Sequence, residues 1–237
     1  MGSLVDYRRD TSNVRITMDD GKVNVLSTRM LADLHDAFER ASAEGVPVVL
    51  SGRDRVFSAG FDLNVLRGGG PQAAQMLNSG FRLAERILSF PTPVVIACTG
   101  HAIAMGFFLL LSGDYRIGAA GPFKLTANEV ALGLVMPRTP VALCQYRLVP
   151  GYFDRAILLA ELFSPEVAVA GGILDRVVEA AEVEEAVKGL VATLAALDMP
   201  AHRASKLRAR GALLATLRET IVADDADYRA TFPASST

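Results

Sequence analysis

The sequence of 237 residues contains no tryptophan, and it has only three histidines and two cysteines, Cys98 and Cys144. Both cysteines lie in apolar runs without metal-type spacing, which excludes a disulfide scaffold and a zinc module and fits a reducing compartment. Net charge is also nearly absent, because 24 basic residues face 26 acidic ones, which gives −2. This balance provides no electrostatic reason to expect nucleic acid or an anionic membrane as a partner. The first ten residues show no apolar stretch typical of a secretory signal, so we expect a cytoplasmic protein.

Several catalytic motifs are absent as well. There is neither a G-x-S-x-G nucleophile elbow nor a G-x-x-x-x-G-K-[ST] phosphate loop, and the scattered histidines indicate no metal site. One segment, Gly68-x-Gly70-x-x-Ala73, loosely matches a dinucleotide fingerprint. It follows Leu66-Arg67 rather than a strand, and Pro71 stiffens the loop that would wrap a pyrophosphate. A flexible turn is the better interpretation, and a nicotinamide enzyme is the weakest hypothesis.

What is present is a large apolar fraction, 51% against 21% charged residues, which excludes a disordered chain and supports one sizeable core. The apolar stretch from Val94 to Leu111 carries no formal charge over a length that could span a bilayer. However, Gly100 and His101 lie at its middle, and no basic residue is close to either end. We therefore interpret it as a buried strand over Val94–Cys98, a turn and a buried helix.

Hydrophobic periodicity predicts an α/β fold. Strand-like runs are expected at Leu4–Tyr7, Val14–Met18, Val46–Leu50, Val94–Cys98 and Tyr115–Gly118. Helical spacing is shown by two sets of apolar residues between them: Met30, Leu34, Phe38 and Ala41, then Met76, Leu77, Phe81, Ala84 and Leu88. Alternating strands and helices favour parallel pairing, because each crossover helix must cover a face of the sheet.

The last third of the chain is predicted to be mostly helical. One apolar stripe contains Val183, Val187, Leu190 and Leu194, and a second contains Leu207, Leu214, Leu217 and Ile221. Between the two parts, Ile173–Val178 is a candidate last strand. We place the α/β core at residues 1–180 and the helical region at 181–237. Pattern alone leaves open whether these helices face a subunit partner or pack on their own core.

Two segments rich in small residues are candidates for a ligand site. Phe57-Ser58-Ala59-Gly60-Phe61-Asp62-Leu63 follows a presumed strand, and Gly100-His101-Ala102-Ile103-Ala104-Met105-Gly106 precedes the apolar helix. Small residues let the backbone approach a ligand, and unpaired N–H groups at a helix start carry partial positive charge. Two such groups aimed at one point would form an oxyanion hole. The alternative is a pair of tight turns with nothing bound, and Asp62 and Asp114 would then be turn or cap residues.

Glu129 is the third candidate, because it is the only acidic residue between Asp114 and Asp154. A carboxyl group among apolar neighbours tends to a raised pKa, which suits a base that works near neutrality. The competing interpretation is structural, since Thr126-x-x-Glu129 fits a capping box that would only secure a helix start.

In chain order, these motifs resemble those of the crotonase (enoyl-CoA hydratase/isomerase) family. Phe57–Leu63 is similar to its F-x-A-G-x-D-L signature, Gly100–Asp114 to its second signature, and Asn128-Glu129 with Leu132-Gly133 to its catalytic acid segment. Lys22-x-Asn24-x-Leu26-Ser27 also resembles the family's K-x-N-A-L-S turn. The resemblance extends from about residue 5 to at least residue 210. It implies a ββα spiral core with a helical C-terminal trimerisation region, in a homotrimer or a hexamer built as a dimer of trimers.

The resemblance also implies the substrate and the site. Members of the family bind an acyl-CoA thioester and stabilise its enolate with two backbone N–H groups, here those of Phe61 and Met105. It assigns the acid/base role to Glu129, and coenzyme A is part of the substrate rather than a separate cofactor. The implied substrate-binding residues are Lys22, Asn24, Leu26, Ala59, Gly60, Phe61, Asp62, Leu63, Asn64 and Gly106.

Two departures from the family pattern bear on the reaction. Met105 replaces the usual glycine, which requires a negative φ at that position. Phe108 occupies the place where hydratases with two glutamates carry their first catalytic acid. A shift of the double bond from 3-enoyl-CoA to 2-enoyl-CoA needs only one base, so this sequence favours an isomerase of fatty-acid metabolism over a hydratase that adds water to 2-enoyl-CoA.

The same two departures are compatible with a non-catalytic acyl-CoA-binding member of the family, because Met105 and Phe108 fill space where substrate usually lies. Lys206 is expected to be either a solvated surface residue or a partner for a CoA phosphate of a neighbouring subunit. Acyl chain length, and trimer against hexamer, are not determined by the residues.

Overall fold

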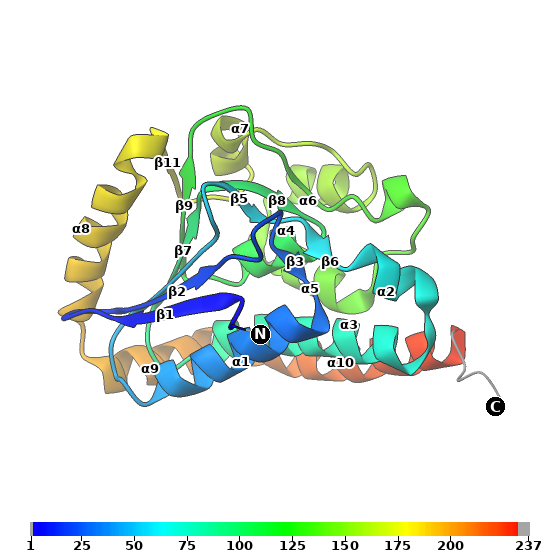
Figure 1. The fold of residues 1–237 in the computed structure, drawn as a ribbon, viewed down its shortest axis with the longest axis horizontal. Coiled ribbons are helices and arrows are strands. Elements are labelled where there is room, and N and C mark those ends of the chain that lie inside the picture. The colour runs from blue at the N-terminus through cyan, green and yellow to red at the C-terminus, as the bar shows by residue number, and fades with distance from the viewer. Residues whose placement is uncertain (1, 232–237) are drawn as a thin grey trace.

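The computed structural model describes residues 2–231 and shows an α/β spiral (Figure 1). Its main sheet has six strands in the order β1-β2-β4-β7-β9-β11. Only β1 and β2 pair antiparallel, and the other neighbours are parallel. The bounds of these strands are β1 Val5–Arg9, β2 Val14–Met18, β4 Val48–Ser51, β7 Val94–Cys98, β9 Tyr115–Ala119 and β11 Arg176–Val178. The predicted strands are thus confirmed, with shifts of up to three residues at their ends.

A second, smaller sheet gives the fold its spiral character. It is parallel, in the order β10-β8-β5, with β5 at Arg55–Ser58, β8 at Gly100–Ile103 and β10 at Leu125–Thr126. Strands β3 (Val25–Leu26) and β6 (Gly60–Phe61) form a further parallel pair. Each turn of the chain supplies one strand to the main sheet and the next to the small sheet, as β4 and β5, β7 and β8, β9 and β10. The turn expected after Cys98 is therefore wrong, because Gly100–Ile103 is a strand.

Helices cover both faces of the main sheet. Val48 and Leu50 of β4 point to one face, which α1 (Thr28–Ser42), α3 (Gly70–Ser89) and α4 (Met105–Leu111) cover. Val49 points to the other face, onto Val187 and Val191 of α8 (Val183–Ala195). Figure 1 shows α8 on one side of the sheet, with α1, α3 and α10 (Gly211–Thr231) together on the other. Strands buried on both faces read as continuous apolar runs, as observed here.

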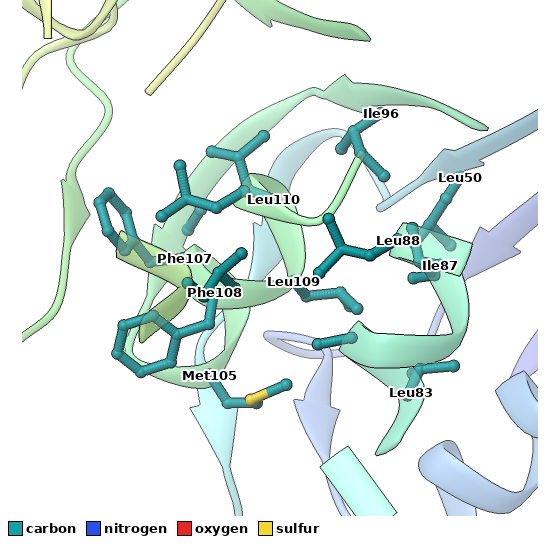
Figure 2. Packing of buried hydrophobic residues seen from close by; sticks show 14 of the residues in the cluster. Leu50, Leu83, Ile87, Leu88, Ile96, Met105, Phe107, Phe108, Leu109 and Leu110 are labelled. Atoms are coloured by element: carbon teal, nitrogen blue, oxygen red, sulfur yellow. The ribbon is translucent and has the colours of Figure 1, made fainter. Parts of the chain in front are cut away.

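Helix α4 is hydrophobic all round, and all seven of its residues are buried, which is typical of a core helix. Figure 2 shows Leu109 of this helix beside Leu88 of α3, whereas Phe107 and Phe108 extend from the other side of the helix. No helix within residues 2–231 is long and apolar enough to span a bilayer, and the stretch from Val94 to Leu111 is divided among β7, β8 and α4.

The predicted helices are confirmed where the period is clear. Helix α1 buries the four expected residues, and Ser27 caps it by accepting the Met30 N–H at 3.2 Å. Helix α10 packs on α3 and on α5 (Arg138–Arg147), with Leu214, Leu217 and Ile221 buried. Leu207 is 38% exposed and does not continue the predicted stripe, because it lies on the separate helix α9 (Met199–Ala209).

The remaining helices connect these layers. They are α2 (Leu63–Gly68), α6 (Pro150–Ile157), α7 (Pro165–Ala170) and the short 3₁₀ turns Val130–Leu132 and Ala180–Glu182. Gly68–Gly70 joins α2 to α3 and follows no strand, so the structural context of a dinucleotide fingerprint is missing.

Candidate active site

A cavity of about 70 Å³ is lined by residues of β6, α2, α3, α4, α5 and α10 and of the segments that join them. It is mostly apolar, and Glu129 is the one carboxylate among the described residues that line it. Ala59 and Phe61 line it from the first signature segment, and Ala104 and Phe108 line it from the second. The other lining residues are Leu63, Leu66, Leu77, Phe81, Asn128, Leu132, Leu134, Val135, Pro137, Pro140 and Tyr228. An apolar cavity with few polar groups is typical of a small-molecule site.

The first signature segment is held rigidly against the second. Gly60 has φ +87°, and a Cβ atom there would lie 2.8 Å from the Ile103 carbonyl oxygen and 3.2 Å from the Met105 nitrogen. A Cβ on Gly106 would in turn lie 2.5 Å from the Ser58 carbonyl oxygen. The two segments therefore touch through backbone atoms, which explains the small residues in both.

The Phe61 side chain anchors its own backbone. Its ring packs edge-on to Phe81, with centroids 6.0 Å apart, and a Cβ on Gly80 of α3 would lie only 2.5 Å from a ring carbon. Glycine at position 80 thus makes room for the ring. Strands β3 and β6 hold the same residue from the other side, because Leu26 pairs with Phe61.

In the second segment the residue with a positive φ is Ala104, one position before Met105, which replaces the family's glycine. Ala104 has φ +50° and ψ −124° at the N-cap of α4, whereas Met105 begins the helix with a negative φ. A non-glycine residue at positive φ costs about 1–3 kcal/mol and is concentrated at functional sites. The condition that Met105 must satisfy to replace glycine is therefore met.

The Met105 N–H is at the first position of α4, and within residues 2–231 it donates no hydrogen bond to the chain. The cavity reaches Ala104, and the Met105 side chain is fully buried in the core (Figure 2). Met105 thus does not fill substrate space, in contrast to the expectation for a non-catalytic member. Phe108 does line the cavity, and it is 2% exposed.

Glu129 reaches the cavity because β10 pairs with β8. Thr126 pairs with Ile103, and the Ala104 N–H donates to the Thr126 carbonyl at 2.9 Å, so the chain delivers Glu129 next to the second segment. The predicted capping box is not formed, because Thr126 lies in β10 and its hydroxyl donates to the Ala160 carbonyl at 3.4 Å. Glu129 lies at the start of a 3₁₀ turn and makes no side-chain cap.

The Glu129 carboxyl group has the properties of a base that works near neutrality. Burial raises its pKa from the ordinary value of 4.5 to about 7, and its own backbone N–H opposes this shift. The Oε2 atom is buried and has no hydrogen-bond partner in the described chain, and the same holds for Oδ1 of Asn128. Buried polar atoms without partners are costly, so a bound water or a ligand at these two atoms would stabilise the site.

The residues implied in substrate binding are divided by the structure into two groups. Lys22, Leu63 and Asn64 are exposed, and Ala59 and Asp62 are half-buried. Asp62 caps α2 by accepting the Asn64 N–H at 2.9 Å. Gly60 and Gly106 are buried.

Leu26 and Asn24 have no exposed surface. The Asn24 amide donates to the carbonyls of Met18 and Phe57 at 3.0 and 3.1 Å, and its oxygen accepts the Asp20 N–H at 3.1 Å. All polar atoms of the Asn24 side chain are therefore used to fix the turn, and the assignment of Asn24 to substrate binding stays a prediction.

Both expectations for Lys206 are wrong. It is 6% exposed, and its Nζ lies 2.7 Å from Oδ2 of Asp114 and 3.3 Å from the Thr92 carbonyl. Asp114 also pairs with Arg210 at 2.7 Å and accepts the Val94 N–H at 2.7 Å. Asp114 is thus more than a turn residue: it fixes α9 to the N-terminal ends of the neighbouring strands β7 and β9, inside the main sheet.

Ala104 and Tyr228 are among the cavity-lining residues that were not predicted from the sequence. Ala104 stands inside a motif, but only its φ distinguishes it, and no pattern of side chains records that angle. Tyr228 lies 99 positions after Glu129 and lines the same cavity from α10. Burial raises its pKa, and the charges of Asp224 and Glu129 add to the effect. No local signal in the sequence distinguishes this tyrosine from others.

Comparison with known proteins supports this arrangement. The model of the family described as enoyl-CoA hydratase/isomerase matches residues 8–235. The crystal structure of an enoyl-CoA hydratase from Mycobacterium marinum is 43% identical, with a TM-score of 0.91 over 95% of this chain and 100% of that one. Human mitochondrial Δ3,Δ2-enoyl-CoA isomerase is 27% identical, with a TM-score of 0.91 over 97% of this chain and 92% of that one.

A curated relative, the carnitinyl-CoA dehydratase of Salmonella typhi, is 26% identical over 197 residues, which cover 82% of this chain and 75% of the relative. The names of these similar proteins thus differ in reaction but all refer to CoA compounds, and the two solved structures share the fold. From its motifs, its spiral fold and the match over nearly its whole length, the chain belongs to the enoyl-CoA hydratase/isomerase (crotonase) family of enzymes.

Proposed function

We propose that this enzyme isomerises 3-enoyl-CoA to 2-enoyl-CoA, with Glu129 as its acid/base. The observation that carries the proposal is a single carboxylate among the described residues that line the cavity, with the phenyl ring of Phe108 where the resemblance places the first catalytic acid of hydratases. The named relatives include both a hydratase and an isomerase, so the choice between the two reactions depends on the site itself.

The proposed reaction moves one proton within the substrate and adds no atoms to it. The ionised Glu129 takes a proton from C2 of the substrate, and the electron pair shifts into an enolate whose thioester oxygen is bound by the N–H groups of Phe61 and Met105. Glu129 then returns the proton at C4, which forms the double bond between C2 and C3. Oxyanion donors of this kind are each worth about 3–4 kcal/mol of transition-state stabilisation. The step uses no cofactor, since coenzyme A is part of the substrate.

Hydration would make a different demand on the site. It requires a positioned water and two proton transfers, and the apolar ring of Phe108 offers neither a hydrogen bond nor a proton. The raised pKa of Glu129, about 7, suits the shuttle because the same group must both accept and return a proton.

A parallel assay tests the proposal. One preparation is given 3-enoyl-CoA and 2-enoyl-CoA of equal length, and products are identified by mass spectrometry as isomer or hydrated thioester. We expect turnover of the 3-enoyl substrate and a loss of about 10²–10⁴-fold in Glu129→Gln. Glu185→Gln, at an exposed position of α8, is the matched control. Full activity of Glu129→Gln, or hydration as the main reaction, would overturn the proposal.

We also propose a homotrimer or hexamer in the cytoplasm, acting in fatty-acid metabolism, as the family resemblance implies. Exposed apolar side chains after α6 support an interface, since Leu159 is 71% and Leu158 59% exposed. Sedimentation equilibrium measures the assembly directly, and a monomer at micromolar concentration would contradict this part of the proposal.

A further inference from the structure

We infer that Tyr228 closes the acyl pocket and restricts this enzyme to acyl chains of about six carbons or fewer. The inference rests on the proposed function, because it takes the cavity at Glu129 as the place of the acyl tail. Tyr228 is then a specificity-determining residue at the end of the tail.

Tyr228 lies between two hollows of different size. The inner one is the cavity of about 70 Å³ that contains Glu129, and the outer one is a surface groove of about 480 Å³. Tyr228 lines both, and so do Leu134, Val135 and Pro137 of the facing loop. The tyrosine on α10 and this loop are therefore the partition between the two hollows.

The size of the inner cavity limits the tail. A water-sized group needs about 10–15 Å³ of such volume, so 70 Å³ holds about five to seven groups of that size. A methylene is similar in size to water, so a tail of about six carbons fills the cavity. Further carbons would have to pass Tyr228 into the outer groove.

The partition is held in place by its own helix. Asp224, one turn before Tyr228, is 3% exposed and accepts the N–H groups of Arg138 and Thr139 at 3.0 and 2.9 Å. These bonds join α10 to the first turn of α5. Because the backbone of α10 is fixed there, truncating the Tyr228 side chain should open a passage rather than move the helix.

The outer groove offers a path for the longer tail. Its wall on the side of the loop is apolar, with Leu134 and Val135, whereas Arg138 and Asp227 form an ion pair on the side of α10, 2.5 Å apart. A tail that passes the partition would lie along the apolar wall. Burial of one more methylene improves affinity about fourfold.

The experiment compares 3-hexenoyl-CoA with 3-decenoyl-CoA in the parent enzyme and in Tyr228→Ala, Tyr228→Phe and Val222→Ala. Val222 is 63% exposed on the same helix and is the matched control. We expect the parent enzyme to prefer the shorter substrate and Tyr228→Ala to raise the ratio of kcat/KM, decenoyl over hexenoyl, at least tenfold. Tyr228→Phe and Val222→Ala should retain the parent ratio, because neither opens the partition.

The chain-length preference is also measured without turnover. The quantity is then the ratio of the dissociation constants of hexanoyl-CoA and decanoyl-CoA, determined by calorimetry. If the enzyme turns over neither substrate but Tyr228→Ala shifts this binding ratio, the isomerase proposal fails and the inference on Tyr228 stands. If Tyr228→Ala does not fold, Leu134→Ala opens the partition from the loop side and should shift the ratio in the same direction. A ratio within twofold of the parent in the folded variant, or equal use of both lengths by the parent, would overturn the inference.

Discussion

Replacing Glu129 by glutamine should make the protein more stable above neutral pH while it removes activity. In the folded chain the pKa of Glu129 is about 7, and its ordinary value is 4.5. Below pH 4.5 the carboxyl group is protonated in both states and contributes nothing. Between the two values the unfolded chain ionises first, so the free energy of unfolding falls as pH rises.

Above pH 7 the Glu129 carboxyl group is ionised in both the folded and the unfolded chain. The loss of unfolding free energy that its burial causes is then complete. A shift from 4.5 to about 7 corresponds to about 3 kcal/mol at most, because each unit is worth about 1.4 kcal/mol and solvent at this half-buried side chain reduces the effect. Glutamine keeps the shape of the protonated acid and does not titrate. The Oε2 atom of Glu129 is buried without a hydrogen-bond partner in the described chain, so this carboxyl group lowers stability and is retained for function.

Urea unfolding at a series of pH values from 4.5 to 8.5 measures this effect in the parent, Glu129→Gln and Glu185→Gln. The difference in unfolding free energy between Glu129→Gln and the parent should grow with pH and level off above about pH 7.5. A difference that stays constant over this range, or that moves against Glu129→Gln as pH rises, would refute the reasoning. Exposed Glu185 carries the same chemical change outside the cavity and serves as the control.

Three further results are expected. Gly60→Ala should lower kcat/KM by about 10²–10³-fold, because its Cβ would displace the oxyanion segments, whereas Gly45→Ala, also at positive φ but with open space around it, should affect stability alone. Asp114→Asn should cost about 3–5 kcal/mol in urea unfolding, since it leaves two buried cations without their counterion. Asp225→Asn, which removes an exposed pair, should cost less than about 1 kcal/mol. Finally, kcat/KM should rise with pH up to about 7 and then level off, as ionised Glu129 requires; a flat profile down to pH 5 would contradict its role as the base.

The elements that could be predicted are those whose burial repeats along the chain. Helices α1 and α3 and strands β2 and β7 have a clear period or a continuous apolar run, and their positions follow from it. The small sheet could not be predicted in this way. Its strands are two to four residues long, and pairing with segments distant in the sequence, such as Gly100 with Arg55, makes them strands.

The burial of charged residues could not be predicted from the sequence either. Lys206 reads as a surface lysine because its neighbours are polar, yet it is buried against Asp114, 92 positions away. Buried charges persist only when they are paired, and pairing across that distance leaves no trace in the local pattern.

The sequence by itself determined the family and the order of its motifs, because the small residues of Phe57–Leu63 and Gly100–Gly106 and the acid at Glu129 are choices of residue type that the chemistry requires. Only the tertiary structure decided which of them meet. It placed the positive φ at Ala104, used up the amide of Asn24 inside a turn and brought Tyr228 of the C-terminal helix to the wall of the cavity. The physical reason is that angles, burial and contacts between distant segments are properties of the packed chain, whereas residue type and spacing are already present in the unfolded one.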